Sequence, residues 1–229
     1  MDEREAMEYV GRVEGAFCWM KRTNRLDELW AKAIPLEAGA GYLLPLCELH
    51  AEDSELIEML GRWRDESAHV YPTQFPVTFN GTKNWLRRCL LDNPDRILFL
   101  IVDSFGKPVG HVGFASAINP KGLIELDNLL RGSLRGHREI VRFAVEALMQ
   151  WAQETISPAG FYLRVLSSLK HVIKLDQRLG FGEISRIPLR RHVDGDHISF
   201  VECALEDVEP PDEWFVKMEY QPRQRVKTA

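Results

Sequence analysis

The sequence predicts an α/β fold in which a mixed, mostly antiparallel sheet carries helices on both faces. Its segments follow in the order strand, two helices, three strands, helix, strand, helix and two strands. Strands 96–103 and 107–115 are separated only by 104-SFG-106, which is typical of a hairpin. One β-α-β crossover, through a long helix at 137–156, then joins two strands of the sheet.

Two terminal segments are expected to flank the main domain. Residues 1–39 have apolar side chains at helical spacing, and 35-PLEAGAG-41 ends that pattern. So short a helical segment is marginal alone, so we expect it to pack on the main domain or on a second subunit. At the other end, residues 209–229 carry two prolines and a basic end, and are expected to form a loosely held tail.

The main domain is expected to span residues 40–208. It begins with strand 42–49, and the apolar residues of helix 52–67 then share one helical face. The segment 69–79 contains two prolines and three aromatic residues and is expected to be a loop. Helix 82–91 follows and leads into the hairpin.

The second half of this domain contains the crossover. The long helix 137–156 has a broad apolar face that includes Ile140, Leu148 and Trp151. Gly180 is suited to end a later helix, because glycine adopts the left-handed conformation without steric cost. The sequence 194-DGD-196 indicates a turn. The remaining expected elements are strands 122–130 and 160–166, helix 168–179, and strands 181–189 and 197–205.

Composition and charge exclude several classes of protein. A formal net charge of −5 argues against a nucleic-acid-binding protein held by phosphate contacts. Residues 1–10 lack the apolar core of a signal peptide, and no uncharged run approaches the length of a membrane span. We therefore expect a cytoplasmic protein. The cysteines show no C-x-x-C spacing, so buried free thiols are expected, with no disulfide and no metal site; they are Cys18, Cys47, Cys89 and Cys203.

Residues 42–205 resemble the GNAT superfamily of acyl-CoA-dependent N-acyltransferases. Two stretches carry this resemblance: strand 122-GLIELDNLL-130 with 131-RGSLRG-136 and the long helix, and 162-YLRVLSSLKHVIKLDQRLGF-181. The stretches 62-RWRDES-67 and 71-YPTQF-75 also resemble members that act on small molecules, including amino-sugar nucleotides. The resemblance implies a central pair of parallel strands, 122–130 and 160–166, that splay apart to admit acetyl-CoA.

The resemblance also implies an acyl-CoA site where strand 122–130 meets the long helix. Backbone N–H groups in a glycine-containing loop that enters a helix favour an anion, here the coenzyme A pyrophosphate. An N–H group near Leu129 would hold the thioester oxygen. The implied cofactor-binding residues are Leu129, Leu130, Arg131, Gly132, Leu134, Arg135, Gly136, His137 and Arg138.

Four positions depart from the family's pattern. Arg138 and Ile140 stand where its loop has small residues, so their bulk would obstruct the pyrophosphate or give the loop a different shape. Leu169 replaces an asparagine early in the second helix. Asp176 replaces a tyrosine that protonates the departing thiolate, and an aspartate is ionised at neutral pH unless strongly perturbed.

Six further side chains are candidates for catalysis and acceptor binding. Glu125 and Asp127 share one strand face and would accept the amine proton, although an exposed strand face is the competing interpretation. His111 would act as a base or be a core histidine with a satisfied hydrogen bond. Arg64, Tyr71 and Phe75 would contact the acceptor, or belong to a solvated helix end and ordinary loop packing.

The main functional hypothesis is an N-acyltransferase, with acetyl-CoA as the default donor and the amine of a small molecule, such as an amino sugar, as acceptor. No metal, nucleic acid or membrane partner is expected, and a homodimer is left open. One alternative is a GNAT-like protein that binds a ligand or partner without catalysis. Another is a transferase that acylates protein N-termini or lysines.

Overall fold

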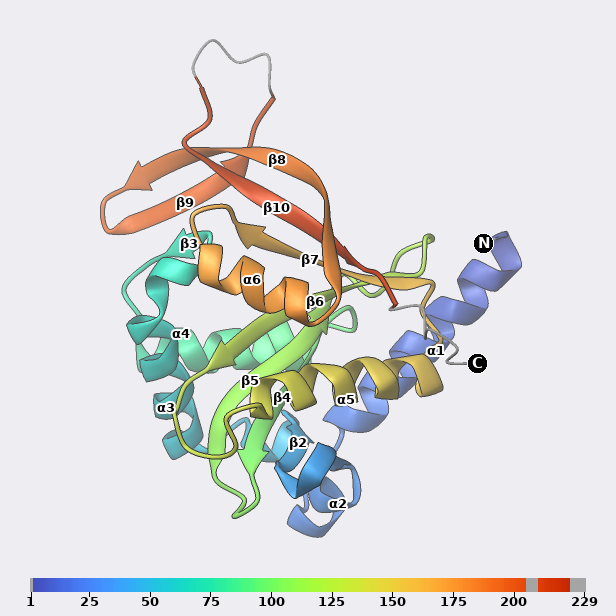
Figure 1. Cartoon of the computed structure of the whole chain (residues 1–229). Helices are drawn as coiled ribbons and strands as arrows, with labels where there is room; N and C mark the ends of the chain where they lie inside the picture. The colour runs from blue at the N-terminus through green and yellow to red at the C-terminus, as the bar shows by residue number, and fades with distance from the viewer. Residues whose placement is uncertain (1, 205–209, 223–229) are drawn as a thin grey trace. The chain divides into compact units, whose positions relative to one another are not determined.

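Figure 1 shows the computed structural model, which describes residues 2–204 and 210–222. The chain divides into two compact units. The first unit consists of Met1–Glu66 and Val77–Phe161. The second consists of Ser67–Pro76 and Tyr162–Ala229.

The first unit is built on an antiparallel sheet. Its strand order is β1-β2-β4-β5-β6, and each neighbouring pair is antiparallel. The central strand β4 is buried along its whole length, as its uninterrupted apolar run 97-ILFLIV-102 requires. The strands are β1 (Ile34–Pro35), β2 (Gly41–Pro45), β4 (Ile97–Asp103), β5 (Pro108–Ala115) and β6 (Leu123–Arg131).

Helices cover both faces of this sheet. Leu98 and Leu100 of β4 belong to a core cluster that they share with α3 and η4. On the other face, the Phe99 ring meets Trp151 of α5 edge-on, with ring centroids 5.5 Å apart. The helices are α1 (Glu3–Lys21), α2 (Leu26–Ala31), α3 (Ser54–Glu66), α4 (Phe79–Asn84), the π-helical η4 (Trp85–Leu91) and α5 (Ile140–Thr155), with short 3₁₀ turns η1 (Glu37–Gly39) and η2 (Glu48–His50).

The N-terminal helix α1 packs on the first unit. Asp2 and Glu5 form a capping box that satisfies its first N–H groups. The buried Tyr9 hydroxyl donates to the Ala117 carbonyl at 2.9 Å, and the Phe17 ring stacks on Trp151 with centroids 6.4 Å apart. Residues 1–39 were expected to pack on the main domain or on a second subunit, and these contacts show α1 packed on the first of these. The boundary at residue 39 stays a prediction.

Strand β7 begins beside the beginning of β6. The Ala159 N–H donates to the Gly122 carbonyl at 2.8 Å, and the Phe161 ring stacks on Phe114 of β5 with centroids 5.8 Å apart. The β6–α5–β7 segment is the expected β-α-β crossover, and its two strands start side by side. The splay of this pair further along stays a prediction.

The second unit holds a second antiparallel set of strands. Their order is β7-β10-β8-β9-β3, and β8 and β9 form a long hairpin that turns at Gly195 (Figure 1). Gly180 has a φ of 97° and ends the helix α6, as the sequence predicts. The elements are η3 (Ala68–Val70), β3 (Thr73–Gln74), β7 (Gly160–Leu166), α6 (Lys170–Arg178), β8 (Phe181–Asp194), β9 (His197–Glu202) and β10 (Glu213–Tyr220).

Two expectations about this unit are wrong. Residues 213–220 are not part of a loose tail but form β10, which pairs with both β7 and β8. Val216 and Met218 alternate with Lys217 and Glu219, and this period of two buries the apolar pair completely. The loop 69–79 also contains the short strand β3, which pairs with β9. Residues 223–229 of the expected tail lie outside the described part of the chain.

The predicted class, a mixed α/β fold with mostly antiparallel strands and helices on both faces of a sheet, is confirmed. Within the described ranges, no helix combines the length and the apolar character needed to cross a membrane.

Candidate active site

A β-bulge interrupts the pairing of β5 with β6. The register shifts between His111 and Gly113, so Val112 faces two residues, Asn128 and Leu129. Asn128 has a φ of 53°, a left-handed conformation that asparagine adopts more readily than most residues. The irregularity thus includes Leu129, near which the resemblance implies an N–H donor for a thioester oxygen.

The His111 side chain is bonded to this bulge. Its Nδ1 atom lies 2.6 Å from the Asn128 carbonyl oxygen, so Nδ1 carries the proton in the neutral ring. Burial lowers the pKa of His111 to about 4; the hydrogen bond to Asn128 opposes this shift, and the Arg64 charge adds to it. The ring is therefore neutral at physiological pH. Its role as a base stays a prediction.

Asp127 is a half-buried carboxylate next to the bulge. Its Oδ2 atom lies 3.2 Å from Nη2 of Arg96 and accepts a hydrogen bond from Asn128 Nδ2 at 2.7 Å. Burial raises the pKa of Asp127, Arg96 opposes the shift, and the nearby Glu125 adds to it. The carboxylate is therefore more basic than an ordinary aspartate.

Glu125 lies two residues before Asp127 and is buried at 6% exposure. Its Oε2 atom lies 3.4 Å from the Ser116 hydroxyl. The competing interpretation of an exposed strand face therefore does not describe Glu125, whereas Asp127 has a side chain that is 29% exposed.

The loop between β6 and α5 is folded around the Arg131 side chain. The guanidinium lies 3.2–3.4 Å from four carbonyl oxygens of this loop. They belong to Ser133, Leu134, Arg135 and Arg138. Arg131 thus donates to the loop that follows it.

Several N–H groups of the same loop have no protein acceptor. Within residues 2–204 and 210–222, this holds for the N–H groups of Leu134, Gly136, His137 and Arg138. They immediately precede α5, whose helix dipole favours negative charge at its N-terminus. The loop therefore presents a set of donors suited to an anion.

The two bulky residues of the loop take different directions. The Arg138 side chain is 90% exposed and lies 3.8 Å from the Glu139 carboxylate. Ile140 is completely buried, and a Cβ atom placed on Gly136 would lie 3.3 Å from its Cδ1 atom. One side chain thus extends into solvent and the other into the core.

Trp63 of α3 packs directly against the start of the loop. A Cβ atom on Gly132 would lie 2.2 Å from two carbons of the Trp63 ring, so only glycine fits there. The N–H groups of Gly132 and Ser133 both donate to the Val109 carbonyl at 3.0 Å. The Trp63 ring centroid also lies 6.1 Å from that of His111. Trp63 therefore links the loop to the histidine that holds the bulge.

The candidate acceptor residues divide between the two units. Arg64 follows Trp63 in α3, and its charge acts on His111. Tyr71 and Phe75 belong to the second unit, where the Phe75 ring stacks on His197 with centroids 6.0 Å apart. Their role in acceptor binding stays a prediction.

Asp176 meets the condition under which an aspartate keeps its proton. It is buried in α6 at 2% exposure, and burial raises its pKa to about 7. Its carboxyl group therefore keeps its proton to a higher pH than an ordinary aspartate. Leu169 occupies the N-cap of the same helix, without a side-chain hydrogen bond.

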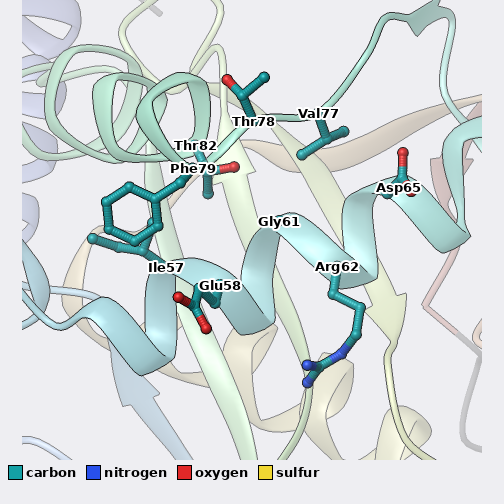
Figure 2. Close-up of a pocket in the computed structure, with 9 residues that line it drawn as sticks. All are labelled: Ile57, Glu58, Gly61, Arg62, Asp65, Val77, Thr78, Phe79 and Thr82. Atoms are coloured by element: carbon teal, nitrogen blue, oxygen red, sulfur yellow. The ribbon is translucent and has the colours of Figure 1, made fainter.

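A surface pocket of about 290 Å³ lies between α3 and the start of α4. Figure 2 shows Ile57 of α3 close to Phe79 of the facing Val77–Thr82 segment, while the Arg62 side chain of α3 points away from that segment. None of the candidate site residues lines it. In the part of the chain that the structure describes, no group of three or more histidine, cysteine and acidic residues is placed to hold a metal.

Sequence reasoning missed three residues of this site. Trp63 is one of the apolar residues of the expected helix 52–67, and Arg96 begins the expected strand 96–103, but neither is predicted as a site residue. Asn128 had a visible signal, because it follows Asp127 directly and breaks the alternation of polar and apolar residues in 122–130.

A bulged strand followed by unpaired N–H groups and a long helix is an arrangement suited to holding a phosphate-bearing ligand. No protein-family model matches the sequence, and no curated protein sequence is significantly similar to it. Solved structures do match. A probable acetyltransferase of the GNAT family from Chromobacterium violaceum is 18% identical, with a TM-score of 0.58 over 81% of this chain and 85% of that one.

The names of two further matched structures state the acceptor of the acetyl group. RimL, a ribosomal L7/L12 alpha-N-protein acetyltransferase, has a TM-score of 0.61 and 13% identity over 82% of this chain and 93% of its own. A spermidine N-acetyltransferase SpeG chimera from Vibrio cholerae and hSSAT has a TM-score of 0.54 and 11% identity over 73% of this chain and 91% of its own. The chain therefore has the GNAT fold, and the resemblance seen in the sequence is confirmed in the architecture.

Proposed function

We propose that this chain is an acyl-CoA-dependent N-acyltransferase that moves an acetyl group from acetyl-CoA to the primary amine of a small molecule. The observation that carries the proposal is the set of unpaired N–H groups at Leu134, Gly136, His137 and Arg138, directly before α5. The GNAT fold supports it, because the matched structures are described as acetyltransferases.

The loop and the bulge are proposed to bind different parts of acetyl-CoA. The unpaired loop N–H groups and the dipole of α5 fit the diphosphate of coenzyme A, and Leu129 and Leu130 lie where the resemblance implies the pantetheine arm. Bound acetyl-CoA supplies an activated acyl thioester. The N–H of Leu129, a residue of the bulge, is the proposed donor to the oxygen on which negative charge develops.

Asp127 is the proposed proton acceptor for the amine. An amine attacks only when neutral, and a carboxylate with a raised pKa takes up its proton more readily than an ordinary aspartate. Glu125 shares this face and supports the raised pKa through its own charge. His111, with Nδ1 committed to Asn128, then serves to hold the bulge. Attack is proposed to be direct, because no cysteine is among the candidate residues. The expectation of buried thiols holds for Cys47 but is wrong for Cys18 and Cys89, which are exposed.

Asp176 is linked to this reaction only through the resemblance, which concerns protonation of the departing thiolate. The resemblance assigns this step to a tyrosine at the same position, and an acid with a pKa of about 7 is a suitable replacement. Replacing Asp176 with asparagine removes the proton but keeps the shape. The rate of acyl transfer is expected to fall, while the KM for acetyl-CoA stays nearly constant.

Two measurements test the function. Calorimetry with acetyl-CoA should show binding, and no binding at millimolar ligand would remove the cofactor assignment. A thiol-release assay should then be run with a panel of amines that includes amino sugars, polyamines and peptides with free N-termini. Release with small amines alone supports the proposed acceptor class, and release with peptides alone moves the function to protein acylation.

A binding protein without catalysis is the second candidate function. It is favoured by Leu169, which stands at the N-cap of α6 where the family's pattern has an asparagine. This candidate predicts binding of coenzyme A with no thiol release for any amine of the panel. Measurable turnover with any amine excludes it.

A further inference from the structure

We infer that Arg131 is a positioning residue that holds the loop from Gly132 to Glu139 in its anion-binding conformation, and that it acts through the loop without touching the ligand. The inference rests on the proposed acyl-CoA function. Arg131 is thereby assigned a role different from that of the other residues expected to bind the cofactor, because its side chain bonds to the loop itself.

The first step is the set of acceptors around the guanidinium. Nε lies 3.2 Å from the Ser133 oxygen, and Nη1 lies 3.2 Å from that of Arg138. Nη2 lies 3.3 Å from the Leu134 oxygen and 3.4 Å from that of Arg135. Three nitrogens of one planar group thus bind carbonyls from both ends of the loop. A guanidinium has the number and spread of donors to do this.

The second step follows from peptide geometry. In a planar trans peptide, the N–H of the next residue points opposite to the carbonyl. Carbonyls that converge on Arg131 therefore direct the following N–H groups away from it, and these include the N–H groups of Leu134 and Gly136. Both lack a protein acceptor, as found above. The arginine sets the orientation of two of the donors that an anion would use.

Backbone hydrogen bonds also hold the two ends of the loop. Gly132 and Ser133 are anchored to Val109, and the Ile140 N–H donates to the His137 carbonyl at 3.0 Å. Between these anchors, the Arg135 N–H reaches only its neighbour's hydroxyl, Ser133 Oγ, at 3.3 Å. Arg131 is therefore the side chain that ties the two ends of the loop together, and its strand position opposite Gly110 fixes its own backbone.

The test compares Arg131→Lys and Arg131→Gln with the wild type. Lysine keeps the charge but presents one nitrogen, so it cannot span four carbonyls. We expect hydrogen exchange at Gly132, Ser133 and Ile140 to accelerate in both variants. The KM for acetyl-CoA should rise by about tenfold or more, which is the loss of one or two net hydrogen bonds. Arg186→Lys is the control, because that side chain pairs with the Glu183 carboxylate on β8, outside the loop.

A truncated donor separates positioning from general damage. S-acetyl-N-acetylcysteamine has the thioester but no diphosphate, so kcat/KM for it should stay within about twofold of wild type in both variants. If Arg131→Lys keeps the hydrogen-exchange rates and the KM for acetyl-CoA of the wild type, only the charge matters and the inference is overturned. Faster exchange with an unchanged KM would overturn it as well. If the wild type binds no acetyl-CoA, the proposed function fails, while the exchange measurement still decides whether Arg131 holds the loop.

Discussion

The imidazole of His111 donates its Nδ1 proton to the main-chain carbonyl of Asn128, across a distance of 2.6 Å. This bond joins β5 to the bulged residue of β6, where the register of the two strands shifts. A left-handed residue inside a strand costs free energy, and a hydrogen bond from a buried side chain offsets part of that cost. The histidine therefore stabilises the local geometry that places Leu129.

Replacing His111 should expose this role. In His111→Leu the buried carbonyl loses its donor, and we expect a loss of about 1–3 kcal/mol in the free energy of unfolding at pH 7.5. His111→Asn keeps an N–H donor close to the Nδ1 position and should recover part of the loss. Urea unfolding of the three proteins measures both values. Equal stability of the leucine variant and the wild type would contradict a structural role for this bond.

The same histidine predicts a pH dependence. Its folded pKa, about 4, lies below the unfolded value of 6.5, so between these values the unfolded chain binds the extra proton. Falling pH therefore removes stability over this window, by up to about 3 kcal/mol. His111→Asn should lack this component, so its stability relative to wild type should rise from pH 7.5 to pH 4.5. A parallel pH profile for the two proteins would sink the prediction, and His192→Asn on the exposed hairpin is the control.

Gly132→Ala should destabilise the protein through Trp63. The added Cβ atom would lie 2.2 Å from the ring, which is buried and has little room to move. Overpacking of this kind costs about 1–3 kcal/mol, and moving the loop start should also weaken acetyl-CoA binding. Gly15→Ala is the matched control. It meets nothing within 4 Å in the exposed part of α1, so it should stabilise the protein by about 0.5–1 kcal/mol.

A double-mutant cycle identifies the cause. Trp63→Ala removes the whole ring from the contact, so Gly132→Ala should cost less in that background than in the wild type. Urea unfolding of the four proteins gives the coupling energy. Strict additivity of the two substitutions would show that Gly132 is needed for another reason.

Local signals made most of the fold predictable. Helical periodicity indicated α3 and α5, the expected helices 82–91 and 168–179 overlap η4 and α6, and the hairpin at 104–106 set the order of β4 and β5. The start of α4 at Phe79 was expected to belong to a loop. Strand β10 was missed because two prolines and a basic end dominated the expectation for residues 209–229. The alternation of Val216 and Met218 with charged residues was present in the sequence, but short alternating runs far along a chain acquire meaning only when neighbouring strands are known.

The candidate site was less predictable because it depends on contacts between distant segments. The loop residues were named from the resemblance, yet the carbonyls that surround Arg131 follow from the path of the loop in space. His111 was named for its chemistry, and its bond to Asn128 depends on a register shift that the spacing of residues does not encode. The raised pKa of Asp176 was also not predictable, because it depends on burial, which the sequence alone does not reveal.

Tyr9→Phe tests whether α1 is part of the first unit's stable core. The Tyr9 hydroxyl donates to the Ala117 carbonyl, and both lie in a region without solvent access. Its removal leaves that carbonyl without this donor, so we expect a loss of about 1–2 kcal/mol without a change in the cooperativity of unfolding. A separate unfolding transition for α1 in the wild type would contradict this. Met7→Ala, at an exposed position of the same helix, should change the stability little.

Asp176→Asn should stabilise the protein at high pH. The folded pKa of Asp176, about 7, lies above the unfolded value of 3.8, so the folded state binds the extra proton between them. Wild-type stability therefore falls as pH rises through this window, by up to about 4 kcal/mol, whereas asparagine carries no charge to bury. Urea unfolding should give nearly equal stabilities at pH 4 and a clear advantage for the variant at pH 8. Asp65→Asn, at an exposed position of α3, is the control. An advantage of Asp176→Asn that is independent of pH would mean that burial of its charge is not the cause.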